Sequence, residues 1–150
     1  MEWVSFGGSG ASTRFEGPDV RFPGLGIGLE VLGPGEPMAM YQAEDAQEGF
    51  LVLSGEAVLV VEGQERPLRA WDYVHCPPET AHVIVGAGSG PCVVFAVGAR
   101  RKGRGLRYPV DEVALRHDAG VREETSDPAV AYADFPEPSI VMCPEELPDL

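Results

Sequence analysis

Two short polar clusters flank the most apolar stretch of this 150-residue chain. They are Gln42, Glu44 and Glu48 on one side, and the segment from His75 to His82 on the other. Carboxylate, amide and imidazole groups bind divalent metal ions and transfer protons, so these residues are the candidates for chemistry. Between them, residues 50–63 are rich in valine and leucine and contain the turn Ser54-Gly55-Glu56. This pattern predicts a β-hairpin with polar residues at both ends.

The segment before Glu48 predicts the wall of a pocket. Alternate side chains of a strand over residues 38–44 share one face. That face carries Met38, Met40, Gln42 and Glu44. Its apolar residues give way to polar ones, as they do at a pocket mouth. Phe50 stands two residues after Glu48, so both side chains point to the same face of their strand. Met38, Met40 and Phe50 are therefore the candidate pocket residues.

The rest of the chain predicts a single all-β domain. Short apolar runs alternate with turns, and 19 Gly and 14 Pro leave little room for long helices. The length suits one domain, since domains cluster near about 100–150 residues. Residues 110–117 form a short amphipathic helix at most, and an acidic, proline-broken tail follows.

The composition excludes several classes of partner. A formal net charge of −13 opposes binding to nucleic acid and to anionic membrane surfaces. No apolar run reaches the roughly 18 residues that span a membrane, and the N-terminus lacks the basic and apolar segments of a secretory signal. Three cysteines at wide spacings are typical of reduced thiols. We therefore expect a cytoplasmic protein that binds neither nucleic acid nor membrane.

The spacing of five residues resembles the cupin superfamily. Glu48 and Gly55 match the end of its first motif, G-x5-H-x-H-x3,4-E-x6-G. Pro77 and His82 stand in register with its second motif, G-x5-P-x-G-x2-H-x3-N. Asp72 matches the aspartate that usually follows the first glycine of that second motif.

This resemblance implies a double-stranded β-helix, the jelly-roll barrel of cupins. The barrel core would span residues 25–98, after an N-terminal arm over residues 1–24. The arm would cover either a partner subunit or its own barrel. Residues 99–150 would form an irregular C-terminal extension, packed on the barrel or trailing from it. Because cupins commonly pair through a sheet edge, the resemblance also implies a homodimer.

The resemblance further implies a metal site. The two histidine positions of the first motif fall on Gln42 and Glu44, which would converge with Glu48 and His82 inside the barrel. With an amide and a carboxylate in place of two imidazoles, the ligand set favours manganese, magnesium or zinc over a nitrogen-rich iron site. The expected cofactor is a divalent metal ion, with zinc, manganese, iron and nickel left open. In the metal-free alternative, Gln42 and Glu44 lie in water at the rim, and Glu48 and His82 form a hydrogen-bonded pair.

Three further residues are weaker candidates. His75 stands next to Cys76, but adjacent strand residues face opposite ways, which predicts an outward His75 and a buried Cys76 rather than a zinc site. His117 is expected at the surface. Cys143 has no neighbouring base in the sequence to activate it.

Two classes of function stay open. One is a metal-dependent cupin enzyme of isomerase, hydrolase or dioxygenase type, with Glu48 as the catalytic residue and either Glu48 or Glu44 able to act as general base if it is not a ligand. The other is a barrel that binds a small ligand without turnover, or a vestigial cupin that lacks metal. In either case the expected partner is a small molecule.

Overall fold

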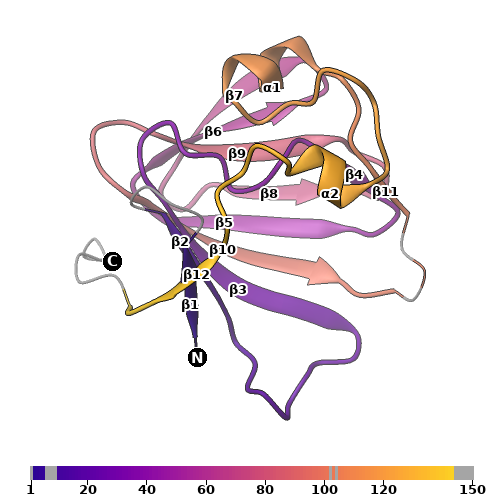
Figure 1. Cartoon of the computed structure of the whole chain (residues 1–150). Coiled ribbons are helices and arrows are strands. Elements are labelled where there is room, and N and C mark those ends of the chain that lie inside the picture. The colour runs from indigo at the N-terminus through magenta and orange to yellow at the C-terminus, as the bar shows by residue number, and fades with distance from the viewer. Residues whose placement is uncertain (1, 6–9, 102, 104, 144–150) are drawn as a thin grey trace.

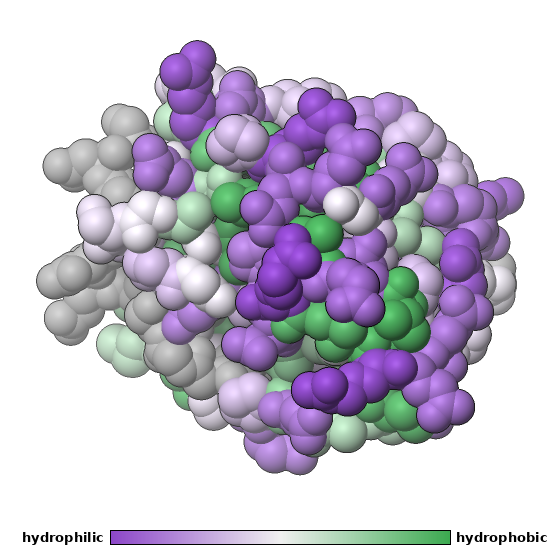
Figure 2. Space-filling model, turned by 90° about the horizontal axis from the view of Figure 1, so that it is seen from above, coloured by the Kyte–Doolittle hydropathy of each residue, from purple (hydrophilic) through white to green (hydrophobic). Residues whose placement is uncertain are grey.

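The computed structural model describes residues 2–5, 10–101, 103 and 105–143. Its architecture is two antiparallel β-sheets packed face to face, with two short helices at one end (Figure 1). Among the described residues, no helix is both long enough and apolar enough to cross a lipid bilayer. The face seen from above in Figure 2 is mostly hydrophilic, with smaller apolar areas between the polar side chains.

The larger sheet has seven strands in the order β12-β1-β2-β3-β10-β5-β8. They span Trp3–Ser5 (β1), Ala11–Arg14 (β2), Leu25–Leu32 (β3), Glu48–Ser54 (β5), Tyr73–Cys76 (β8), Cys92–Ala99 (β10) and Ser139–Val141 (β12). All neighbouring strands are antiparallel. The N-terminal arm therefore contributes two strands to the sheet of its own barrel, and β12 from the C-terminal extension pairs with β1.

The smaller sheet has three strands in the order β7-β6-β9. They span Glu56–Val61 (β6), Gln64–Arg69 (β7) and His82–Ala87 (β9). A separate two-stranded ladder joins Ala43–Glu44 (β4) to Leu106–Arg107 (β11). The main core lies between the large and small sheets. Its buried residues are Leu32, Phe50, Val52, Ala57, Leu59, Leu68, Cys76, Ile84, Cys92 and Val94.

The predicted hairpin over residues 50–63 is wrong. β5 pairs with β10 and β8, whereas β6 pairs with β7 and β9, so the chain crosses from one sheet to the other at Gly55. Gly55 has a φ of +76°, and a Cβ there would collide with the Pro91 carbonyl. The next turn is a true hairpin, because Glu62 and Gly63 have φ values of +47° and +74° and join β6 to β7.

Two short helices lie in the C-terminal extension, where the sequence predicted one at most. Helix α1 spans Glu112–Arg116, and the Asp111 side chain accepts hydrogen bonds from its first turn. It packs Val113 and Ala114 on the outer face of the small sheet. Helix α2 spans Pro128–Ala131 after the cap Asp127. Asp followed by Pro is a helix-start signal that could have predicted α2.

Candidate functional site

A cavity of about 480 Å³ lies between the sheets at the end that carries β4 and α2. The seven residues singled out from the sequence all line it, namely Met38, Met40, Gln42, Glu44, Glu48, Phe50 and His82. The predicted strand over residues 38–44 is regular only in β4, and the residues before it form bends with isolated bridges to β9. Met38, Met40, Gln42 and Glu44 nevertheless line the cavity as the alternation predicts, although Ala39 lines it as well.

His82 is the most buried polar residue that lines the cavity. It begins β9, is only 5% exposed, and bridges to Gln42 through the backbone. Its Nδ1 lies 2.8 Å from the carbonyl oxygen of Thr80, and because a carbonyl can only accept, Nδ1 carries a proton. Its Nε2 lies 3.3 Å from Oε2 of Glu48. The aromatic ring of Phe50 packs 5.3 Å from the imidazole.

The surroundings of His82 favour the imidazolium form. Burial disfavours the charge, but hydrogen bonds with Cys76, Glu48 and the Thr80 carbonyl outweigh it and raise the pKa of His82 to about 10. The register of β5 and β8 sets Glu48 opposite Cys76, so both side-chain partners reach His82 from neighbouring strands. With a pKa of about 10, His82 favours its protonated form beside Glu48 at neutral pH.

Gln42 and Glu44 form a second pair. The Gln42 amide Nε2 donates to Oε1 of Glu44 at 3.0 Å. Glu44 is 6% exposed and Gln42 is half-buried, so the metal-free alternative was wrong to place Glu44 in water at the rim. The hydrogen-bonded pair of Glu48 and His82 in that same alternative is present.

Four charged or polar residues of the cavity were missed from the sequence, namely Ser12, Arg14, Glu30 and Tyr132. Glu30 on β3 is 7% exposed, and its Oε1 lies 2.6 Å from Nη1 of Arg14 on β2. Burial raises the pKa of Glu30, against the opposing effect of the Arg14 charge. A lone carboxylate in an otherwise apolar strand was the available signal for Glu30. Tyr132 comes from the C-terminal extension, and no local pattern places it in the cavity.

The four predicted ligands do not fit a resident metal ion as they lie. Within the residues that the structure describes, no three His, Cys, Asp or Glu side chains are grouped to hold a metal. The Gln42 side chain presents its NH2 group to Glu44, and the amide nitrogen is not a metal donor. In the protonated form that its hydrogen bonds favour, Nε2 of His82 carries a proton, and His82 would lose that proton on binding a metal. Only His82 and Glu48 approach each other as two ligands of one ion would.

The other sequence candidates lie outside this cavity. His75 is exposed and Cys76 is 2% exposed, which confirms the strand-parity prediction. His75 pairs with Gln47 at 3.1 Å. His117 caps α1 and lies 2.7 Å from Glu65, on the far side of the small sheet. Cys143 is exposed, and the three cysteines, all among the described residues, form no disulfide.

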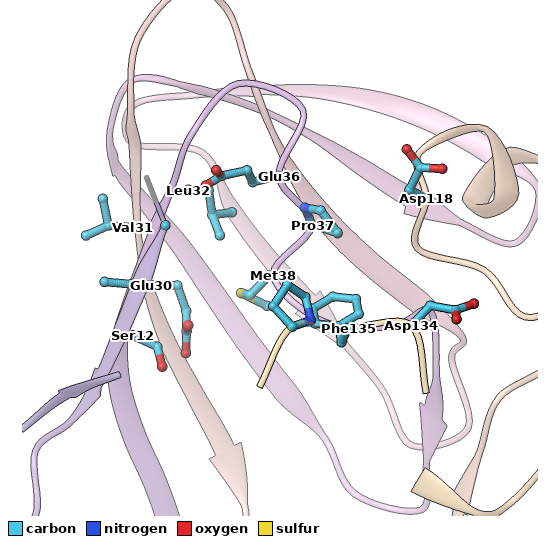
Figure 3. Close-up of a pocket in the computed structure, with 13 residues that line it drawn as sticks. Ser12, Glu30, Val31, Leu32, Glu36, Pro37, Met38, Asp118, Asp134 and Phe135 are labelled. Atoms are coloured by element: carbon cyan, nitrogen blue, oxygen red, sulfur yellow. The ribbon is translucent and has the colours of Figure 1, made fainter. Parts of the chain in front are cut away.

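A second cavity of about 300 Å³ adjoins the first, and the two share Ser12, Glu30, Met38 and Phe135. In Figure 3, Ser12 and Glu30 lie on one side of it and Asp118 and Asp134 on the other. Met38 and Phe135 lie between these two sides. The shared residues show that the wall between the two cavities is thin.

Comparison with known proteins identifies the fold. Residues 28–98 match the family described as "Cupin domain", so the predicted cupin fold is confirmed. A "Putative sugar phosphate isomerase" from Acidithiobacillus ferrooxidans is 26% identical with a TM-score of 0.58, over 64% of each chain. A sugar phosphate isomerase of Silicibacter pomeroyi is 23% identical with a TM-score of 0.61, over 70% of this chain and 73% of that one.

A cupin 2 conserved barrel domain protein of Salinispora arenicola is 25% identical with a TM-score of 0.54, over 63% of this chain and 79% of that one. No curated protein sequence matches significantly. The chain thus spans about two thirds of the length of the Acidithiobacillus protein and shares with these structures a jelly-roll barrel.

Proposed function

We propose that the cavity binds a small, neutral, polyhydroxylated carbonyl compound and that His82 and Glu48 move protons on it. The observation that carries this proposal is the pairing of the buried His82 side chain with Glu48, with 3.3 Å between Nε2 and Oε2, in the wall of a cavity of about 480 Å³. A cavity of this size suits a small molecule. The 26% identical Acidithiobacillus protein, which is named for sugar phosphate isomerisation, supports the polyhydroxylated carbonyl part of this proposal but not the lack of charge.

The pair has the groups that an enolisation needs. The Glu48 carboxylate takes the proton from the carbon next to the carbonyl. The electron pair of the broken C–H bond forms a C=C bond between that carbon and the carbonyl carbon. The His82 imidazolium gives its Nε2 proton to the carbonyl oxygen, which yields a neutral enediol. Return of a proton from Glu48 to the other carbon, with loss of the neighbouring hydroxyl proton to His82, completes an isomerisation.

The charge of the cavity favours a substrate without a phosphate group. Among the described lining residues, three carboxylates face two cations. Arg14 is already paired with Glu30, and His82 with Glu48. A phosphate would therefore meet an excess negative charge, whereas hydroxyl groups can donate hydrogen bonds to the carboxylates.

Solvent exchange tests this proposal. D-ribose, D-xylose and D-glucose would each be incubated with the protein in D2O, and loss of the C2 proton followed by NMR. The wild type should exchange at least one of the three sugars. Glu48→Gln and His82→Gln should slow this by at least about 10²-fold, while His75→Gln, altered at an exposed histidine, should match the wild type. Absence of exchange in the wild type, or equal rates in all variants, would refute the acid–base pair.

A divalent metal bound by Gln42, Glu44, Glu48 and His82 is the second candidate. One observation favours it, because a ligating histidine typically donates its other ring N–H to a carbonyl, as His82 does to Thr80. This site requires loss of the His82 proton and rotation of the Gln42 amide. Elemental analysis of protein purified without chelator distinguishes the two candidates. The proton-transfer site predicts well under one metal per chain, and a bound metal predicts about one, lost in His82→Ala and retained in His75→Ala.

The homodimer implied by the resemblance is also a proposal. The edge strand β8, in which Tyr73 is 61% exposed, and the preceding Trp71, which is 74% exposed, support it. Light scattering during gel filtration measures the mass directly.

A further inference from the structure

We infer that the Tyr132 hydroxyl donates a hydrogen bond to a carbonyl or hydroxyl oxygen of the ligand in the cavity. Tyr132 lies in the C-terminal extension, beyond residues 28–98 of the cupin domain. The extension would thus supply a ligand-binding group that the cupin domain itself lacks. The inference rests on the proposed function, since it assumes that the cavity holds a small oxygen-bearing molecule.

The hydrogen bonds of Tyr132 leave its proton for the ligand. The backbone N–H of Met40 donates to the Tyr132 oxygen at 3.1 Å. A phenol can accept and can also donate its single proton. Among the described residues, no side chain or carbonyl accepts that proton, and Tyr132 lines the cavity beside Met40, Gln42 and Glu44. A half-buried phenol O–H normally finds a partner, and the cavity is where that partner can lie.

The ring of Tyr132 is held in place from two sides. Tyr108 packs edge-on at 5.9 Å and 88°, and Phe135 packs edge-on at 5.1 Å and 72°. Tyr108 is itself 1% exposed, so one side of this clamp is part of the core. The Tyr132 backbone N–H ends α2 by donating to Pro128. A donor fixed in this way binds an acceptor without first losing rotational freedom.

The charges around the cavity keep Tyr132 protonated. Burial raises its pKa, and the charges of Glu44, Glu30 and Glu48 raise it further, so the hydroxyl is a donor at neutral pH. The same carboxylates would repel an anionic ligand group. The acceptor that suits this position is therefore an uncharged carbonyl or hydroxyl oxygen, which agrees with a neutral sugar-like ligand.

Tyr132→Phe tests the inference with a matched control. The variant keeps the ring and its packing and removes only the hydroxyl. Tyr41→Phe removes a hydroxyl that also accepts a backbone N–H, from Glu62 at 3.1 Å, but Tyr41 is buried away from the cavity. Binding of D-ribose, D-xylose and D-glucose would be titrated by NMR. Loss of one neutral hydrogen bond should weaken binding about three- to tenfold in Tyr132→Phe and leave Tyr41→Phe at wild-type affinity.

A second measurement uses the wild type alone, in case Tyr132→Phe does not fold. With tyrosine labelled at Cζ, the bound sugar should shift the Tyr132 resonance and leave that of Tyr41 in place. Wild-type affinity in a folded Tyr132→Phe, or an unshifted Tyr132 signal in sugar-bound protein, would overturn the inference and leave the proposed function standing. If the wild type binds none of the three sugars, both fall.

Discussion

The imidazolium form of His82 makes the stability of the folded protein depend on pH. The pKa of His82 is raised from the ordinary 6.5 to about 10 in the folded state. Below pH 6.5 the ring is protonated in both the folded and the unfolded chain, so the full stabilisation is present. Between pH 6.5 and about pH 10, the folded state binds one more proton than the unfolded state. Stability is therefore lost as the pH rises, and the loss is complete once the pH passes the folded pKa.

The magnitude follows from the proton linkage. One proton of difference lowers the free energy of unfolding by about 1.4 kcal/mol per pH unit. Between about pH 6.5 and pH 8.5 the loss approaches about 2.7 kcal/mol, a large fraction of a typical total of roughly 5–15 kcal/mol. This figure is an upper bound, because the Glu48 side chain is 19% exposed and water screens part of its attraction for His82.

Urea unfolding across this pH range measures the effect. His82→Gln should remove most of the pH dependence, and His75→Gln, at an exposed position, should keep it. The range ends below pH 9 because burial raises the pKa of Cys92 from 9.0 to about 11. Above pH 9 the Cys92 thiol therefore keeps its proton longer in the folded chain than in the unfolded chain, which lowers the free energy of unfolding further. If the wild type and His82→Gln show the same slope, His82 is neutral in the folded state and the imidazolium–carboxylate pair is refuted.

Three further predictions concern other residues of the cavity and of the fold. Arg14→Met leaves the buried Glu30 without its partner at 2.6 Å, so urea unfolding at neutral pH should show a loss of about 1–3 kcal/mol. The loss should shrink as the pH falls and Glu30 takes up a proton, and a pH-independent loss would contradict this. Gln42→His sets a second imidazole beside His82, and calorimetry should show tighter Ni²⁺ binding than in the wild type; unchanged binding would place residue 42 away from any shared site. A Cβ at Gly86 would collide with the Gly33 carbonyl, so Gly86→Ala should cost at least about 2 kcal/mol in thermal or urea unfolding. Gly90→Ala, with open space around it, should cost under about 1 kcal/mol, and equal costs would refute the close approach at Gly86.

Parity was the part of the site that the sequence could predict. Residues 38–42 form bends rather than a strand, yet Met38, Met40 and Gln42 still face the cavity. The bridges from Pro37 to Val85 and from Gln42 to His82 hold both ends of this segment against β9. Extended backbone held at both ends alternates its side chains whether or not it forms a continuous ladder. Parity therefore placed Met38, Met40 and Gln42 at the cavity despite the error in the extent of the strand, and Ala39 is the exception to it.

Pairing between strands was harder to predict than the strands themselves. The turn at Ser54-Gly55-Glu56 correctly indicates that the chain bends there, but the signal is the same for a hairpin and for a crossing between sheets. The burial pattern decides it, because Val52 before the turn and Leu59 after it enter one core from opposite sheets. In a hairpin, Val52 and Leu59 would lie on opposite faces of a single sheet. Each face would then need its own layer to cover it.

The C-terminal extension shows where sequence reasoning ends and why this matters for function. Neither of its two cavity residues, Tyr132 and Phe135, lies within the matched cupin domain or in a motif of it. Their place depends on contacts with Tyr108 and Met40, more than twenty residues away along the chain. At the two histidine positions of the first motif, this chain carries the paired amide and carboxylate of Gln42 and Glu44. A cavity lined by these groups and by the Tyr132 phenol would select its ligand by hydrogen bonding, and Tyr132→Phe tests the part of that selection that comes from outside the matched residues 28–98.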